Sequence, residues 1–267
     1  MKDVRVAAVI FHSVSYDTSH NLESMIKWVK AAKKAGASVI CFPELNITGY
    51  GTDGKIFEAA EEIPGEITGI VSDISSKYDI VILAGMAEKD KSGRIYASHI
   101  VVKPGGYIGV YRKLHLAPVE KDLFTAGDEV MLFDAGGIKF GIQLCYDAHF
   151  PELSTRMALM GADVIFMPHA SPRGTPEEKR RSWMRHLTAR AFDNGLFIVA
   201  CNQCGENAAG LQFPGTGMVI GPSGEVIEKD TCGKEVMIVA DLKAENLEKV
   251  RNHRMRYFLP NRRPEMY

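Results

Sequence analysis

The chain has 267 residues, of which 46% are hydrophobic and 24% charged, and its formal net charge at pH 7 is -1. A chain of this length and composition can bury a large core, so we expect one α/β domain over residues 1–267. The near-neutral charge gives no electrostatic reason to expect nucleic acid or an anionic membrane surface as a partner, and no apolar run approaches the roughly 20 residues of a membrane span.

Apolar runs of strand length alternate with stretches of helical periodicity through the first half of the chain. The opening run at 4–11 is apolar almost throughout, as in a strand that is covered on both faces. From residue 22 onward apolar residues recur at helical spacing, and Gly36 suits the end of that helix. The predicted strands of this half are 4–11, 39–42, 80–84, 95–102 and 107–110, and the predicted helices are 22–36 and 67–78.

The second half continues the alternation. Thr175 and Glu178 have the spacing of a capping box, with Pro176 between them at the first helical position, and they predict a long helix that stops at Gly195. Strands are predicted at 138–144, 163–167, 196–200, 216–220 and 236–240. Such alternation argues for an α/β fold with helices covering the sheets, but it does not separate a doubly wound sheet from a two-sheet sandwich.

The stretch 141–152 reads Gly-Ile-Gln-Leu-Cys-Tyr-Asp-Ala-His-Phe-Pro-Glu and places a cysteine at the end of an apolar strand. Pro151 suits the first position of a helix, so Cys145 is expected near a helix N-terminus, where backbone N–H groups favour a thiolate. A lone cysteine is more often a small hydrophobe that fills a core. This motif alone therefore does not establish a nucleophile.

Two other predicted strands end in charged residues. Glu44 follows the run 39–42 in the sequence Cys-Phe-Pro-Glu-Leu, and Lys113 follows the run 107–110 in the sequence Tyr-Arg-Lys-Leu-His. Singly, each is more often a surface charge. Together, the order Glu44, Lys113, Cys145 in these three frames resembles the nitrilase superfamily of carbon–nitrogen hydrolases, in its amidase and N-carbamoyl amidohydrolase-like branch. The resemblance covers essentially the whole chain.

The resemblance implies a four-layer α-β-β-α sandwich in which the three side chains meet at strand ends. It also implies that Cys145 attacks a carbonyl carbon to form a thioester, with Glu44 as the general base. Lys113 and the backbone N–H of Tyr146 then form the oxyanion hole, where one hydrogen-bond donor stabilises the transition state by about 3 kcal/mol. The carboxylate and the ammonium offset each other's burial cost.

Four further residues complete the expected site. Glu120 matches a second glutamate that helps to position the lysine and the substrate in many amidases of the superfamily. Tyr50, Phe150 and His169 lie beside motif residues and are expected to line the pocket, although each could equally be ordinary packing. The loops at 51–64, 118–128 and 169–176 are expected to shape that pocket.

Two positions bear on the substrate. His149 stands where relatives with a Cys-Tyr-Asp motif often have arginine, which leaves carboxylate-bearing substrates in doubt. Tyr146 stands where many nitrilases have tryptophan, which favours amides or carbamoyl compounds. We therefore expect hydrolysis of a small linear amide or N-carbamoyl amine without cofactor or metal. The alternatives are nitrile hydrolysis by the same triad, or a non-catalytic binding subunit of the same fold.

Cys201 and Cys204 form a CxxC pair, which offers a third hypothesis, a thiol redox protein. A thioredoxin-type pair opens a helix, whereas the segment 205–217 is rich in glycine, and no second pair completes a zinc site. A structural role is therefore favoured. Five cysteines, in a chain whose first residues lead directly into a predicted strand, indicate reduced thiols and a cytoplasmic location.

The tail at 251–267 is rich in arginine and aromatic residues. A nucleic-acid-binding arm is disfavoured because the protein is neutral overall. The resemblance implies instead that this tail lies at a subunit interface of a homodimer or a larger even-numbered homo-oligomer.

Overall fold

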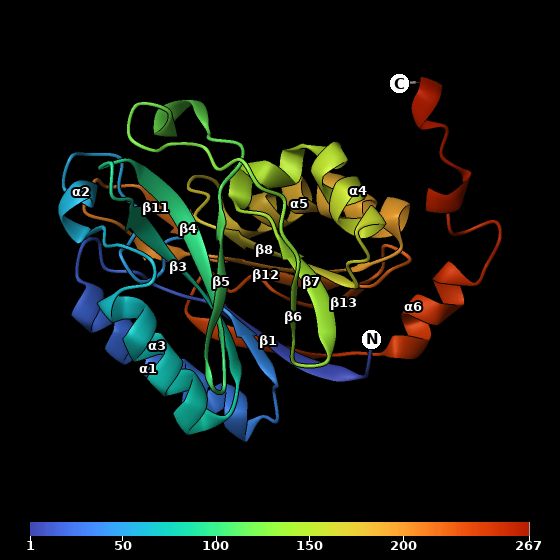
Figure 1. Ribbon diagram of the computed structural model, residues 1–267, viewed down its shortest axis with the longest axis horizontal. Coiled ribbons are helices and arrows are strands. Elements are labelled where there is room, and N and C mark those ends of the chain that lie inside the picture. The colour runs from blue at the N-terminus through green and yellow to red at the C-terminus, as the bar shows by residue number, and fades with distance from the viewer. Residues whose placement is uncertain (267) are drawn as a thin grey trace.

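Two six-stranded sheets lie face to face in the computed structural model, which describes residues 1–266 (Figure 1). The first sheet has the order β14-β1-β2-β3-β4-β5 and the second β13-β12-β9-β8-β7-β6. The strands of the first sheet are β1 (Val4–Ile10), β2 (Val39–Cys41), β3 (Val81–Lys89), β4 (Ile95–Lys103), β5 (Gly106–Arg112) and β14 (Val236–Leu242). Those of the second are β6 (Phe133–Ala135), β7 (Ile138–Ile142), β8 (Val164–His169), β9 (Phe197–Asn202), β12 (Gly217–Ile220) and β13 (Val226–Asp230).

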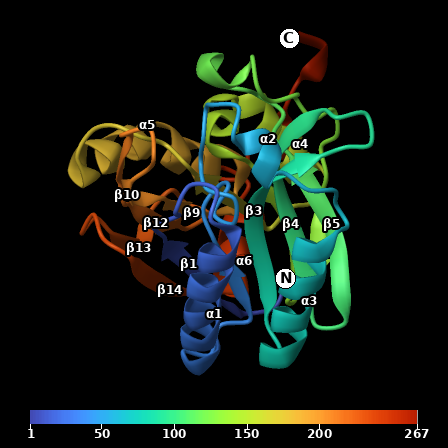
Figure 2. The ribbon, with the colours of Figure 1, turned by 90° about the vertical axis from the view of Figure 1, so that its left-hand side faces the viewer.

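Helices cover the outer face of each sheet. Figures 1 and 2 show α1 (Thr18–Lys34) and α3 (Glu66–Tyr78) on the first sheet, and α4 (Pro151–Leu159) and α5 (Pro176–Asn194) lie on the second. The expected four-layer α-β-β-α sandwich is therefore confirmed. The smaller elements are α2 (Ile56–Ala59), α6 (Ala244–Arg251), the strand pair β10 (Cys204–Glu206) and β11 (Gln212–Pro214), and 3₁₀ turns at Pro118–Glu120, Cys145–His149, Leu259–Asn261 and Pro264–Met266.

Local sequence signals account for the ends of the long helix α5. The Glu178 N–H donates to Thr175 Oγ1 at 3.2 Å, and the Thr175 N–H donates to Glu178 Oε2 at 2.8 Å. This is the reciprocal capping box that the sequence predicted. The helix ends at Gly195, whose φ of 58° lies in the left-handed region that glycine adopts without strain.

Several elements escaped the sequence analysis because they are short or polar. β6 has three residues and α2 four, and α2 lies inside the segment 51–64, where only a loop was expected. β13 is a largely polar edge strand with little buried surface, so it carries no apolar run. β3 continues to Lys89, beyond the predicted end at 84, because its later residues pair with β4.

The carboxyl ends of β2, β5, β7 and β8 point to the same edge of the sandwich. β2 runs parallel to β3, and β7 runs parallel to β8. At this edge the two sheets meet, since Phe11 and Gln203 form an isolated parallel bridge and the Cys204 N–H donates to the Phe11 carbonyl at 3.0 Å. Residues that directly follow these strands are therefore brought together.

No helix formed by residues 1–266 is long and apolar enough to cross a membrane. Within the same residues, no cluster of three or more His, Cys, Asp or Glu side chains could hold a metal ion. In the tail, Met255 and Met266 are exposed, and residue 267 lies outside the described residues. The interface role of 251–267 stays a prediction.

Aromatic side chains fill the space between the sheets. Phe140 of β7 has no exposed surface and contacts Phe133 and Phe166 at centroid distances of 5.6 and 5.2 Å. The residues packed around Phe140 can relax only partly when its ring is removed, so a cavity remains.

We expect Phe140→Ala to lower the free energy of unfolding by about 3–5 kcal/mol, because it removes buried ring surface and leaves a cavity. Denaturant unfolding followed by circular dichroism measures the change. Met255→Ala is the control, since Met255 is 80% exposed and should change stability by about 0.5 kcal/mol or less. Equal effects of the two substitutions would contradict the packing described here.

Candidate active site

Glu44 lies just beyond the end of β2 and is buried, with 1% of its surface exposed. Its Oε2 accepts the Ala170 N–H at 3.1 Å, and its backbone carbonyl accepts Gln203 Nε2 at 2.8 Å. A Cβ at Gly85 of β3 would lie 2.3 Å from the Leu45 backbone nitrogen. The segment that carries Glu44 is therefore held against β3 on one side and against the second sheet on the other.

Lys113 directly follows β5 and is completely buried. Its Nζ lies 2.7 Å from Glu44 Oε1 and 2.9 Å from Glu120. Its backbone is fixed as well, because its N–H donates to the Ala97 carbonyl at 2.9 Å. One ammonium thus joins two carboxylates that come from different loops.

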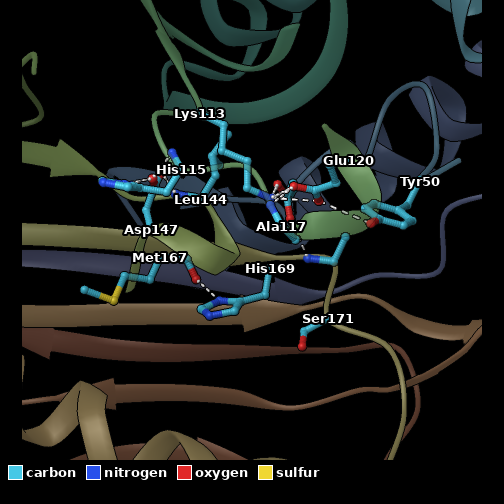
Figure 3. Close-up of polar contacts among 12 residues, drawn as sticks. Tyr50, Lys113, His115, Ala117, Glu120, Leu144, Asp147, Met167, His169 and Ser171 are labelled. Carbon is cyan, nitrogen blue, oxygen red and sulfur yellow. Dashed lines mark hydrogen bonds and ion pairs between the residues drawn. The ribbon is translucent and has the colours of Figure 1, made fainter. Parts of the chain in front are cut away.

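Glu120 belongs to the 3₁₀ turn Pro118–Glu120 and lies beside Lys113, as Figure 3 shows. It accepts the Ala117 N–H at 2.8 Å and the Tyr50 hydroxyl at 3.2 Å. Since Glu120 is only 3% exposed, these donors replace the water that its charge would otherwise require. The structure therefore brings Tyr50 and Glu120 into the cluster that the sequence predicted.

Cys145 opens the 3₁₀ turn Cys145–His149 and is partly exposed. Its φ is 44°, which is in the left-handed region that non-glycine residues rarely adopt. Such strain is often found at functional positions. Tyr146 is the second residue of this turn, and the first N–H groups of a helical turn have no partner within it.

Burial is the largest single contribution to the pKa shifts of the charged and titratable side chains in this cluster. It raises the pKa of Glu44 to about 7, against the opposing effect of Lys113. Burial, followed by the charge of Glu44, raises the pKa of the Cys145 thiol above its usual value. Although burial alone lowers the pKa of Lys113, its acidic neighbours hold that pKa well above normal, so the ammonium stays charged.

Burial and the neighbouring carboxylates therefore oppose the helix N-terminus, which was expected to favour a thiolate at Cys145. Loss of solvent and the charges of Glu44 and Glu120 raise the pKa of the thiol and so favour its protonated form. A base is needed to ionise it. Glu44, with a pKa of about 7, is suited to accept that proton near neutral pH.

A third buried carboxylate, Asp147, was missed in the sequence analysis and holds the turn that carries Cys145 in place. Asp147 Oδ1 accepts the His115 backbone N–H and lies 2.8 Å from His115 Nδ1, and Oδ2 accepts the Leu144 N–H at 3.0 Å (Figure 3). Oδ2 also accepts the Tyr111 hydroxyl at 2.8 Å. Two of these partners flank Lys113 in the chain. The only sequence signal for this network was a charged residue two positions after Cys145.

A cavity of about 470 Å³ opens onto Cys145. Besides Cys145, its lining residues come from five segments: Tyr50, Thr52, Ala117, Val119, Glu120, Tyr146, His149, Ala170, Ser171, Pro172, Arg173 and Leu211. The expected pocket loops at 51–64, 118–128 and 169–176 each contribute to this lining.

Two of the three expected pocket residues lie elsewhere. Phe150 lines a separate cleft of about 480 Å³ and stacks on His115 at a centroid distance of 3.7 Å. The buried His169 donates from Nδ1 to the Met167 carbonyl at 2.7 Å and packs on Trp183 at 4.5 Å. Both were placed in the pocket because they adjoin motif residues, but their backbone direction turns the rings away from it. Tyr50 does line the cavity.

Cys201 lies in β9 and Cys204 lies in β10, so the CxxC pair does not begin a helix. Both thiols are buried, and burial raises the pKa of Cys204 to about 12. A thiol that is buried and protonated is a poor redox nucleophile. These observations favour the structural interpretation of the pair.

The chain matches the family model described as carbon–nitrogen hydrolase over residues 5–252. It belongs to that family, in the nitrilase superfamily. Relatives match it along nearly their whole length. A nitrilase of Pyrococcus abyssi is 36% identical over 99% of both chains, and an omega-amidase of Xenopus laevis is 31% identical over 94% of this chain and 92% of its own.

Solved structures of carbon–nitrogen hydrolases share the fold. A carbon–nitrogen hydrolase from Helicobacter pylori aligns with a TM-score of 0.90 at 28% identity, covering 99% of this chain and 97% of its own. The protein is accordingly a carbon–nitrogen hydrolase, similar in sequence to a nitrilase and to an omega-amidase.

We expect the alkylation of Cys145 by iodoacetamide to accelerate as the pH rises through about 7, because only ionised Glu44 can accept the thiol proton. Glu44→Gln should slow labelling by about 10²-fold or more and remove this step from the pH profile. Mass spectrometry of the peptide that contains residue 145 gives the rate. The exposed Cys232 is an internal control whose labelling should be the same in both proteins. An unchanged profile at Cys145 would rule out Glu44 as the base.

Proposed function

We propose that this carbon–nitrogen hydrolase cleaves a small linear amide or N-carbamoyl amine through a thioester on Cys145 and releases ammonia or an amine. One observation carries the proposal: the buried Lys113 is joined to Glu44 and Glu120, and Glu120 lines the same cavity as Cys145. A nucleophile, a base and a fixed cation are the groups that amide hydrolysis requires.

Acylation begins when Glu44 takes the proton from Cys145 Sγ. The sulfur attacks the carbonyl carbon, and the negative charge that develops on the oxygen is stabilised by the Lys113 ammonium and the Tyr146 N–H. Glu44 then gives its proton to the departing nitrogen as the carbon–nitrogen bond breaks. The thioester remains on Cys145, and ammonia or the amine leaves.

Deacylation uses the same carboxylate. A water molecule donates a proton to Glu44 while its oxygen attacks the thioester carbon, and the collapse of the second tetrahedral intermediate returns the proton to the sulfur. The carboxylic acid product is released. Glu120 takes no proton in this scheme: with the Tyr50 hydroxyl it holds Lys113 in position.

Nitrile hydrolysis is the second candidate, because the relative from Pyrococcus abyssi is named a nitrilase. Tyr146 at the position after the nucleophile favours amides. A non-catalytic subunit of this fold has less support, since burying an intact set of two carboxylates and one ammonium is costly without a function. Assembly into an even-numbered homo-oligomer through 251–267 belongs to the same proposal and rests on the resemblance.

We expect short aliphatic amides and carbamoyl amines to release ammonia and short nitriles to be inert. Cys145→Ala should lower kcat/KM by at least about 10³-fold, since it removes the atom that forms the acyl-enzyme. Cys232→Ala is the matched control, because this thiol is exposed and outside the cavity, and it should retain the wild-type rate. Ammonia release measured for the amides, carbamoyl amines and nitriles shows which substrate class is hydrolysed. A clear preference for nitriles would reverse the choice of substrate class.

A further inference from the structure

Ser171, which lines the active-site cavity, is hydrogen-bonded to the side chain of Lys179. The Lys179 Nζ lies 2.7 Å from Ser171 Oγ and 3.3 Å from the Pro172 carbonyl oxygen. Ser171 lines the cavity together with Cys145, whereas Lys179 is half-buried and does not line it. A hydroxyl at the wall of a cavity, with an amine within about 2.6–3.2 Å of its oxygen, is the arrangement of a serine nucleophile and its base.

The backbone of Ser171 is fixed from the neighbouring strand. Its N–H donates to Asn202 Oδ1 at 2.8 Å, and its carbonyl accepts Asn202 Nδ2 at 3.0 Å. Asn202 is the last residue of β9 and has no exposed surface. Figure 3 shows Ser171 on the loop that follows His169, the last residue of β8. This loop is therefore anchored at the residue that carries the hydroxyl, which keeps the oxygen in one place for attack.

Lys179 has no acidic partner. None of the ion pairs formed by residues 1–266 includes it, and the nearby Glu177 pairs with Arg180 and Arg181. Lys179 is the fourth residue of α5, where the helix dipole disfavours a cation. Burial without a counter-ion lowers the pKa of Lys179. These surroundings therefore favour the neutral amine, the form that can accept a proton.

The hydrogen bond between Lys179 and Ser171 can carry a proton in either direction. A protonated lysine has three N–H donors, of which Ser171 and Pro172 use two. After the loss of one proton, the amine has a lone pair for the Ser171 hydroxyl and keeps an N–H for the Pro172 carbonyl. The contact with Pro172 thus holds Nζ beside Oγ in both protonation states.

Ser171 lies outside the hydrogen-bond network of Glu44. The two oxygens of Glu44 accept Lys113 and the Ala170 N–H. Among residues 1–266, the partners of Ser171 are Asn202 and Lys179. The serine therefore has a base of its own, separate from the carboxylate that we propose as the base for Cys145.

We infer that Ser171 and Lys179 form a second nucleophile and base in this cavity, which hydrolyse small carboxylic esters without Cys145. Lys179 takes the proton of Ser171 Oγ as this oxygen attacks the ester carbonyl carbon, and gives it to the departing oxygen as the carbon–oxygen bond breaks. Water then hydrolyses the acyl-serine, again with Lys179 as the base, and the carboxylic acid is released. Esters suit this pair because an alkoxide or a phenolate leaves more readily than an amine. The inference goes beyond the proposed amide hydrolysis.

The first test uses Cys145→Ala, which removes the competing thiol, and diisopropyl fluorophosphate, a reagent for activated serine hydroxyls. Ser171 Oγ should bond to phosphorus as fluoride leaves, while Lys179 accepts the proton. Trypsin, which cleaves after arginine, gives the peptide 157–173, where Ser171 is the only serine or threonine, so mass spectrometry locates the label. Labelling of this peptide is expected, and its absence would overturn the inference.

Lys179→Arg, made in the Cys145→Ala protein, separates a base from a structural cation. Arginine keeps the positive charge and the N–H donors, but it stays protonated and cannot accept the serine proton. Labelling and the hydrolysis of p-nitrophenyl acetate should both fall by about 10²-fold or more, as they should in Lys179→Met, and Ser171→Ala should lower ester hydrolysis equally. Undiminished rates in the Lys179→Arg protein would overturn the inference, because only a structural role would then remain.

Arg181→Met is the matched control, because it removes one positive charge from the same helix at an exposed position that does not line the cavity. In the Cys145→Ala protein it should leave labelling and ester hydrolysis unchanged. Circular dichroism of each variant checks that it is folded, and Ser171→Ala, which deletes a single oxygen, is the substitution that disturbs the structure least.

Amide hydrolysis separates the failure of this inference from the failure of the proposed function. If Cys145→Ala loses amide hydrolysis and keeps ester hydrolysis that depends on Ser171, both stand. If Cys145→Ala also loses labelling and ester hydrolysis, the inference fails and the proposed function stands. If the wild type hydrolyses no amide while Ser171 is labelled, the proposed function fails and the inference stands.

Discussion

The ion cluster around Lys113 is the interaction on which the arrangement of this enzyme depends. One completely buried ammonium is shared by Glu44 and Glu120, which are themselves buried. No one of these three charges could be buried without the other two, because the desolvation cost of a single buried ion is several kcal/mol. The chain segments after β2 and β5 and the turn at Pro118–Glu120 must therefore fold together, and the active site forms as a unit with the sandwich.

The segment after β5 also positions the nucleophile. Tyr111 and His115, which flank Lys113, both bind Asp147 in the turn that begins with Cys145. One short stretch of backbone thus positions the Lys113 ammonium, the proposed oxyanion cation, relative to Cys145, the proposed nucleophile. The second sheet is joined to this arrangement because Gln203 binds the Glu44 carbonyl and Ala170 binds its carboxylate.

The sequence predicted most of the fold, because buried strands and amphipathic helices leave apolar patterns with distinct periods. The structure brings Glu44, Lys113, Glu120 and Tyr50 together, and Cys145 lines the adjoining cavity, because β2 and β5 of one sheet and β7 of the other end at the same edge of the sandwich. Phe150 and His169 were misplaced because proximity in sequence does not fix the direction of a side chain at a turn. The extent to which burial raises the pKa of Cys145 was not predictable, because burial and nearby charge depend on loops whose path cannot be read from a pattern.

The close contact between Gly85 and the segment that carries Glu44 limits which residues the enzyme can accept at position 85. Even a methyl group at position 85 would lie 2.3 Å from the Leu45 backbone nitrogen and 3.0 Å from the Pro43 carbonyl oxygen. Neither atom is the movable end of a side chain, so the strain could be relieved only by shifting the carboxylate away from its lysine. A mutational scan of β3 should thus find that glycine is the only residue at position 85, next to the segment that carries Glu44, that is compatible with turnover.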